Sequence, residues 1–328
     1  MNHVSRRNRW TRQAVLSVAV LCVAASAARA QTTTAYSTGF DGTDTINGNA
    51  TPTTYASPDF SAATPTAPLA GQNGWTSNDG TTGTVSATNP NQFNGGTTYV
   101  GTLSSTAGSF FNGTQAGAIG GLYGPASGQT PYAVPSTASG GIINLLHGVT
   151  IPSTTTQVVF NIDFAIIEAN ALAKDTFSFT LGSALTITFT PSATTNQFNI
   201  TATGSTPGGG NNADAVVFNS QYHLKITLNP GATPTYAAVL TAGLGGGGTP
   251  SGITGTLATS LSSINQFVVG WNLADKTTNA DGGLTGAGDN FIAFDNLSIA
   301  VPEPSTYAVM AVGLVGLAGV WRSRRQRA

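Results

Sequence analysis

The stretch TQVVFNIDFAIIEA, residues 156–169, alternates apolar side chains with other side chains along most of its length. Because successive side chains of an extended chain point to opposite sides, every second residue lies on the same face. The apolar residues that share one face are Val158, Phe160, Ile162, Phe164 and Ile166. A period of two residues built from Val, Ile and Phe predicts a β-strand with one buried face.

Three other segments repeat this period. They are DTFSFTLGSALTITFT at 175–190, QYHLKITLNP at 221–230 and INQFVVGWNLAD at 264–275. Glycine-rich stretches such as TPGGGNNAD, at 206–214, separate the strands and favour loops. No stretch of 31–300 has a convincing helical period. The spacing therefore predicts an all-β antiparallel sandwich or barrel over 84–300.

The segment before this body is turn-rich. Residues 41–72 contain several prolines, which interrupt regular structure. These are Pro52, Pro58, Pro65 and Pro68. We therefore expect 31–83 to form an irregular N-terminal strand and loops that cross the surface of the body.

Charge is concentrated at the two ends of the chain. Only 8% of the 328 residues are charged, and nine of the 12 basic ones lie in the first 30 or the last seven positions. Residues 31–300 carry 12 acidic side chains against three lysines, a net charge of −9. Nucleic-acid binding needs clustered Lys and Arg, so we expect no nucleic-acid partner for this body.

The first 30 residues have the order of a signal peptide. A basic segment at 6–12 precedes an apolar run at 14–27. Ala28 and Ala30 then form a small-x-small site, which predicts cleavage by signal peptidase before Gln31. The alternative is a buried N-terminal helix.

The only cysteine, Cys22, lies inside that apolar run. Cleavage at the predicted site leaves a mature chain without cysteine, which excludes disulfides and thiolate chemistry. A hydrophobic core must then stabilise the exported body.

The last 28 residues, VPEPSTYAVMAVGLVGLAGVWRSRRQRA, combine three features: a Pro-Glu-Pro motif, an apolar run and a basic end. The apolar run, 305–321, is about 25 Å long as a helix at about 1.5 Å per residue, the short end of a bilayer span. Arginines follow it directly, and they favour the cytoplasmic side, so the body is expected outside. These are Arg322, Arg324, Arg325 and Arg327.

This tripartite end resembles the PEP-CTERM sorting signal of bacterial surface proteins. Its motif here is Val301-Pro302-Glu303-Pro304. The resemblance implies recognition by an exosortase, a membrane transpeptidase-like protease, and removal of the tail. The alternative is a plain membrane anchor with a coincidental Pro-Glu-Pro.

Short motifs of the body carry a second resemblance. They are TGFDG at 38–42, LAGQNGWTSNDG at 69–80 and DNFIAFDNLSIA at 289–300. These resemble concanavalin A-like jelly-roll sandwiches and are also similar to the galactose-binding-like jelly rolls of carbohydrate-binding modules. In both families the first and last strands are neighbours. The resemblance thus implies an antiparallel jelly-roll sandwich.

Residues suited to catalysis are few. His147 and His223 are the only histidines of 31–300, and no G-x-S-x-G sequence presents a serine to them. Glycoside hydrolysis needs two carboxylates that flank the scissile bond. Glu168 is the only glutamate of the body, and Asp163 lies five residues before it, so a regular strand places them on opposite faces. We expect no enzymatic activity, with a glycan-active hydrolase as the remaining alternative.

The jelly-roll resemblance also implies a structural calcium ion, with oxygen ligands from the first and last strands. Asp41, Asp44 and Asp295 are the candidate ligands. The glycine loop NADGGLTGAGDN, 279–290, offers further oxygens. The alternative is that these residues only form turns. No other cofactor is expected.

Sugar binding would use an exposed aromatic ring as a platform. Trp75 and Trp271 are the only tryptophans of 31–300. Trp271 lies in an apolar row and is expected in the core. Trp75 lies in a polar stretch and is the candidate platform, with a buried anchor as the alternative.

Together these features predict a secreted, non-catalytic protein of the bacterial envelope surface or extracellular matrix. Signal peptidase and an exosortase are the expected processing partners, and the C-terminal helix holds an inner-membrane intermediate. A lectin-like protein that binds polysaccharide is the alternative function.

Overall fold

The computed structural model describes residues 32–40, 43–55, 69–78, 84–85, 116–120, 142–151, 157–168, 175–194, 197–204, 211–243, 251–272 and 290–302. The signal peptide predicted over 1–30 and the span predicted over 305–321 lie outside these residues. Within the described ranges, no helix is long and apolar enough to cross a membrane.

The described residues form strands and one short 3-10 helix, η3 (Leu261–Ser263). The strands are β1 (Thr32–Thr38), β2 (Thr43–Ile46), β3 (Asn49–Pro52), β4 (Trp75–Ser77), β5 (Thr84–Val85), β6 (Gly117–Gly120), β7 (Ile142–Gly148), β8 (Val158–Glu168), β9 (Thr176–Leu181), β10 (Leu185–Pro191), β11 (Gln197–Thr203), β12 (Asn211–Val217), β13 (Gln221–Asn229), β14 (Thr235–Ala242), β15 (Ser251–Thr256), β16 (Gln266–Asn272) and β17 (Asn290–Pro302). All four segments with the period of two are strands, so the all-β prediction is confirmed.

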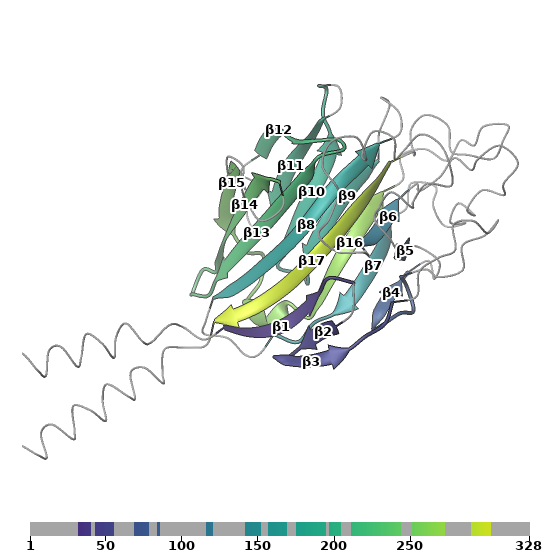
Figure 1. Ribbon diagram of the computed structural model, residues 1–328. Helices are drawn as coiled ribbons and strands as arrows, with labels where there is room; N and C mark the ends of the chain where they lie inside the picture. The colour runs from purple at the N-terminus through teal and green to yellow at the C-terminus, as the bar shows by residue number, and fades with distance from the viewer. Residues whose placement is uncertain are drawn as a thin grey trace, which may run out of the picture. The chain divides into compact units, whose positions relative to one another are not determined.

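The strands pair into two sheets (Figure 1). The ten-stranded sheet has the order β15-β14-β13-β8-β17-β1-β2-β3, with β6 paired to β17 and β5 paired to β6. The seven-stranded sheet has the order β12-β11-β10-β9-β16-β7-β4. Wherever the register is defined, neighbouring strands run antiparallel, as in β8 with β13 and β9 with β16.

Aromatic rings from the two sheets interleave in the core. The Phe160 ring of β8 lies 5.1 Å from the Phe267 ring of β16. Phe164, also on β8, lies 5.6 Å from Phe179 of β9 and 5.0 Å from Phe189 of β10. These side chains are fully or almost fully buried. The alternation seen in the sequence therefore buries one face of each sheet against the other, which makes a sandwich.

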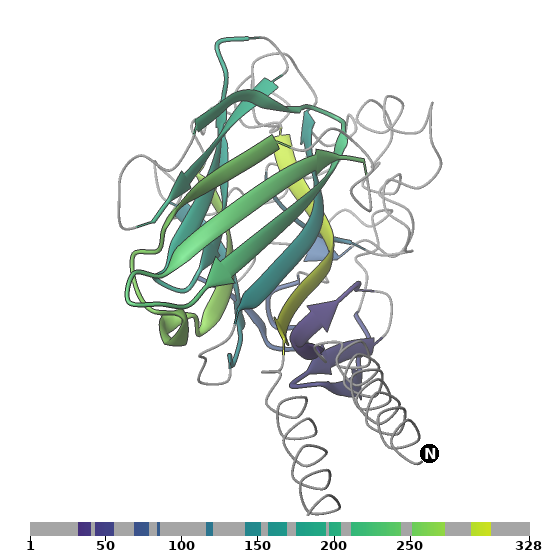
Figure 2. The same cartoon turned by 90° about the vertical axis from the view of Figure 1, so that its left-hand side faces the viewer.

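The first and last strands are neighbours, as the jelly-roll resemblance implied. β17 lies between β8 and β1 in the ten-stranded sheet. Figures 1 and 2 show the yellow last strand beside the purple N-terminal strands. The first and the last described strands thus lie side by side within the ten-stranded sheet.

One part of the N-terminal segment differs from expectation. Residues 43–52 were expected to be irregular, but they form the hairpin β2–β3. Its turn uses Asn47 and Gly48, whose φ angles are 51° and 81°. Asn-Gly accepts positive φ at both central positions, which is the requirement of a tight hairpin turn. This dipeptide was the signal in the sequence for the hairpin.

Candidate functional site

The outer face of the ten-stranded sheet carries a row of polar side chains across three adjacent strands. On β8 and β13, alternate residues such as Ile162 and Leu224 are buried in the core, and the intervening side chains point away from it. The row, called here the outer polar row, consists of Asn161, Asp163, His223, Lys225, Asn296 and Ser298.

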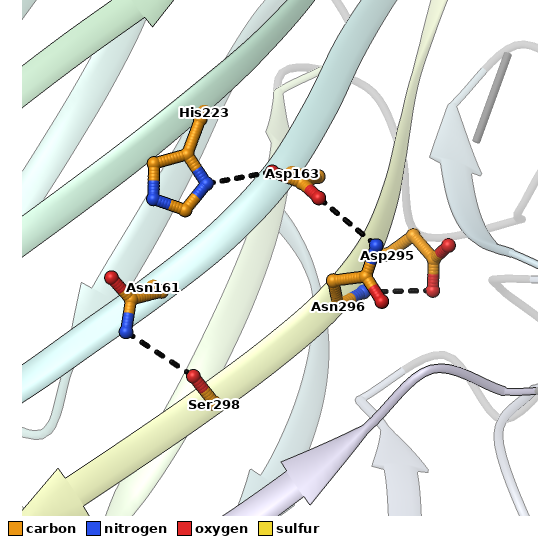
Figure 3. Close-up of polar contacts among 6 residues, drawn as sticks. All are labelled: Asn161, Asp163, His223, Asp295, Asn296 and Ser298. Carbon is orange, nitrogen blue, oxygen red and sulfur yellow. Dashed lines mark hydrogen bonds and ion pairs between the residues drawn. The ribbon is translucent and has the colours of Figure 1, made fainter. Parts of the chain in front are cut away.

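Asp163 is the centre of this row (Figure 3). It is cross-strand partner to His223, whose Nδ1 donates to Asp163 Oδ1 over 2.7 Å. Asn296 Nδ2 donates to the other oxygen, Oδ2, over 2.9 Å. Asp163 is only 6% exposed. Both of its carboxylate oxygens accept hydrogen bonds from protein partners, one on each neighbouring strand. The bond to Nδ1 also fixes the histidine tautomer and leaves Nε2 on the other side of the ring.

A β-bulge brings Asn296 to this position. The register of β17 against β8 shifts between Asp295 and Ser298, and Asn296 has a φ of 49°. The Asn296 backbone N–H donates to Asp295 Oδ1 over 2.7 Å. Bulges often redirect a side chain in this way, and Asn accepts the left-handed conformation more readily than most residues.

The remaining members of the row lie one step along the strands. Asn161 Nδ2 donates to Ser298 Oγ over 3.2 Å. Lys225 pairs in register with Asn161 and is exposed. The row thus presents amide, hydroxyl, imidazole and ammonium groups, a set that can hydrogen-bond to the hydroxyl groups of a sugar.

The two predicted calcium ligands that the structure describes, Asp44 and Asp295, are buried and each accepts a hydrogen bond from the protein. Asp44 is 2% exposed, and its Oδ2 accepts from Tyr55 Oη over 2.9 Å. Asp295 is 1% exposed and accepts from the backbone of Asn296. Asp41 and most of the loop at 279–290 lie outside the described residues. Among the residues that are described, no three His, Cys, Asp or Glu side chains gather into a group that could hold a metal ion. Calcium binding stays a prediction.

Trp75 is not an exposed platform. Its side chain is 0% exposed, and its ring lies 5.8 Å from Phe294, 6.0 Å from Phe40 and 6.3 Å from Phe267. The sugar-platform prediction is therefore wrong, and the alternative of a buried anchor holds. The polar residues around Trp75 in the sequence belong to a turn in which Asn73 and Gly74 have positive φ, so they do not report the environment of the ring.

The sorting motif begins inside the last strand. Val301 and Pro302 are the final residues of β17, and Val301 is 6% exposed. The other motif residues, Glu303 and Pro304, lie outside the described residues. So do the arginines predicted to be cytoplasmic and the residues of the predicted signal-cleavage site, which are Arg322, Arg324, Arg325, Arg327, Ala28, Ala30 and Gln31.

Solved structures with a similar arrangement come from several classes. An endo-β-1,4-glucuronan lyase from Trichoderma reesei is 14% identical, with a TM-score of 0.38 over 70% of this chain and 95% of that one. An alginate lyase from Aplysia kurodai is 11% identical, with a TM-score of 0.35 over 59% and 86%. A lectin from Bauhinia forficata is 13% identical, with a TM-score of 0.33 over 59% and 89%. No curated protein sequence matches the chain.

Residues 300–325 match the family described as the PEP-CTERM protein-sorting motif. The match covers the Pro-Glu-Pro motif, the apolar run and all but the last of the four C-terminal arginines. This family implies processing by an exosortase, export, and a cell-surface or extracellular location. The chain is therefore a β-sandwich protein that carries a PEP-CTERM sorting motif at its C-terminal end.

Proposed function

We propose that this chain is a non-catalytic protein of the bacterial envelope surface or extracellular matrix, released from its membrane anchor by an exosortase. One observation carries the proposal. The match to the sorting-motif family starts at residue 300, within β17, so the signal is joined directly to the last strand of a sandwich with a continuous core. The β-sandwich is the part that is exported, and the C-terminal tail is its sorting signal.

The state of the described carboxylates supports a role without catalysis. Hydrolysis of a glycan needs an acid and a base or nucleophile that both touch the substrate. Asp163 uses both oxygens on His223 and Asn296, and Asp295 is 1% exposed. Neither carboxylate is presented to a polymer outside the protein.

Mass spectrometry of protein recovered from the surface of an exosortase-containing host tests the sorting step. The surface form should lack Trp321 and the arginines after it. Glu303→Ala should leave the tail attached and the protein in the membrane fraction. Thr235→Ala, an exposed position on β14, is the matched control and should be processed like the parent. Intact C-terminal peptides in the surface form of the parent would overturn the proposal.

The outer polar row favours a second function, binding of polysaccharide. Its groups come from three strands. All of them except Lys225 are held by hydrogen bonds within the row, so these side chains lose little freedom on binding. A glycan array with the exported protein tests this function. Asn161→Ala and Lys225→Ala should weaken any signal, and Thr235→Ala should not. A signal that is unchanged in both row variants would exclude this face as the binding surface.

A further inference from the structure

Lys225 differs from the other charged side chains whose burial the structure describes. Four carboxylates are buried, each between 0% and 6% exposed, whereas Lys225, on β13, is exposed. The four are Asp44, Asp163, Asp175 and Asp295. Within the described part of the chain, the ion pair that forms joins Asp163 to His223 and does not include Lys225. The described surface therefore presents an unpaired cation on a body that is acidic as a whole.

Lys225 belongs to the outer polar row, and its register partners on both neighbouring strands are neutral. On β8 the partner is Asn161, and on β14 it is Val239. Directly paired residues of an antiparallel sheet have neighbouring side chains on one face. No carboxylate occupies either of these two positions.

The acidic member of the row, Asp163, is compensated within the protein. Its Oδ1 accepts from His223 over 2.7 Å, and its Oδ2 accepts from Asn296 over 2.9 Å. Figure 3 shows both contacts, which leave neither oxygen without a donor. Because Asp163 is also only 6% exposed, the charge that the row offers to a ligand is that of Lys225.

Neutral hydrogen-bonding groups lie beside this cation. Asn161 Nδ2 donates to Ser298 Oγ over 3.2 Å, which uses one of the two amide hydrogens and leaves the amide oxygen as an acceptor. Since Asn161 is the register partner of Lys225, a ligand that contacts the ammonium group also reaches the amide. The pair thus suits a molecule that carries both a negative charge and hydroxyl groups.

We infer that the outer polar row binds a carboxylated polysaccharide and that Lys225 selects the acidic polymer over a neutral one. The inference rests on the proposed polysaccharide-binding function and adds the class of ligand. The ammonium group of Lys225 donates to the carboxylate of a uronic-acid unit. Asn161 and Ser298 exchange hydrogen bonds with the hydroxyl groups of the sugar.

The presence of one lysine in the row favours a polymer whose charge is sparse. Nucleic acids carry dense charge, and their binding needs clustered Lys and Arg. The net charge of −9 over 31–300 also repels a polyanion from the rest of the body. Repulsion elsewhere and attraction at Lys225 together confine an acidic polymer to the row, which is a basis for specificity.

Binding of the full exported protein to two forms of one polymer tests the inference. The probes are polygalacturonate and the same polymer after its carboxyl groups have been reduced to alcohols. We expect the parent to bind the acidic form about two- to fivefold more tightly, the range of one exposed ion pair. Lys225→Gln should remove that preference, because its amide is neutral, and Lys225→Arg should keep it. Thr235→Ala, exposed on β14, is the control and should keep it as well.

The outcomes separate this inference from the function on which it rests. Equal binding of the two polymers, weakened in Asn161→Ala, would overturn the inference and leave polysaccharide binding at the row intact. Binding of neither polymer would overturn the inference, and the glycan array then decides on polysaccharide binding by itself. A preference for the acidic polymer that Lys225→Gln retains, or equally tight binding to double-stranded DNA, would overturn the inference too.

Discussion

At the scale of single residues, Trp271 and Asp175 show what a sequence reveals and what it hides. The apolar row at 264–275 correctly predicts Trp271 in the core, where it is 3% exposed. Its Nε1 donates to Asp175 Oδ2 over 2.8 Å, across 96 positions of sequence. Asp175 is 0% exposed, so the indole N–H satisfies part of a buried carboxylate. Alternation predicts burial, but a pairing between distant strands depends on their register.

Replacing this indole should therefore cost more than packing alone. Trp271→Phe keeps an aromatic ring but removes both the hydrogen bond and ring volume. We expect the free energy of unfolding to fall by about 2–4 kcal/mol. Urea unfolding of the exported protein measures it. Val217→Ala, at a side chain that is 39% exposed, should change it little. A loss for Trp271→Phe as small as that of this control would contradict the assigned hydrogen bond.

His147 makes stability depend on pH. Burial lowers its pKa in the folded protein below the ordinary value near 6.5, so below that pH the unfolded chain binds the extra proton first. Proton binding then stabilises the unfolded state relative to the neutral folded state. The free energy of unfolding therefore falls as the pH drops from about 6.5 towards the lowered pKa. The contribution is constant above that window. The Tyr36 and Trp75 rings contact the imidazole, and the Asp44 charge partly opposes the lowering of its pKa.

The measurement is the free energy of unfolding from pH 8 to pH 5. His147→Gln should remove the part of the slope that begins near pH 6.5 in the parent, and Thr235→Ala, at an exposed position without a titratable group, should retain it. Equal slopes in the parent and His147→Gln would show that this ring does not titrate between the two states.

At the scale of secondary-structure elements, periodicity predicts the regular parts and misses the irregular ones. β9, β10 and β13 follow from alternation because each has one buried face. β8 and β16 carry the same alternating apolar row, although residues of their other face are buried as well. The hairpin at Asn47-Gly48 was not predicted, because the surrounding prolines suggested an irregular course. The bulge at Asn296 was not predicted either, because one inserted residue in FDNLS leaves the apolar pattern almost intact. That bulge directs Asn296 to Asp163, so the centre of the outer polar row was beyond sequence reasoning.

Two glycines test how tightly the turns are packed. Gly182, between β9 and β10, and Gly243, after β14, have φ values of 51° and 81°. A Cβ at Gly182 would collide with the backbone oxygen of Ser263, whereas one at Gly243 would meet nothing within 4 Å. Gly243→Ala should thus cost about 1–2 kcal/mol for its conformation alone. Gly182→Ala should cost about 1–3 kcal/mol more, because backbone must move.

Thermal or urea unfolding of the two variants side by side checks this difference. Because both positions carry the conformational penalty, the comparison isolates the contact between the β9–β10 turn and the segment at η3. Equal losses would mean that the contact with Ser263 relaxes freely.

At the scale of the whole molecule, β17 belongs both to the core of the sandwich and to the start of the sorting motif. β17 lies in the middle of the ten-stranded sheet, and Ile299 and Val301 are 1% and 6% exposed. Val301 is at once the first residue of the Val-Pro-Glu-Pro motif and the last buried side chain in the described part of the body. A cut before Val301 would take a core side chain away with the tail. We therefore predict that processing takes place on the C-terminal side of Val301.

This overlap predicts that two adjacent motif residues have separable roles. Val301→Ala should lower the free energy of unfolding by about 1–3 kcal/mol, because a buried side chain loses two methyl groups. It should leave the ratio of processed to unprocessed protein unchanged, since the side chain faces the core. Glu303→Ala should do the opposite, with unchanged stability and a retained tail. Unfolding curves, together with mass spectrometry of the surface protein, measure both effects. A mature form that ends before Val301, or a Val301→Ala variant that keeps its stability but loses processing, would assign this valine to the exosortase and not to the fold.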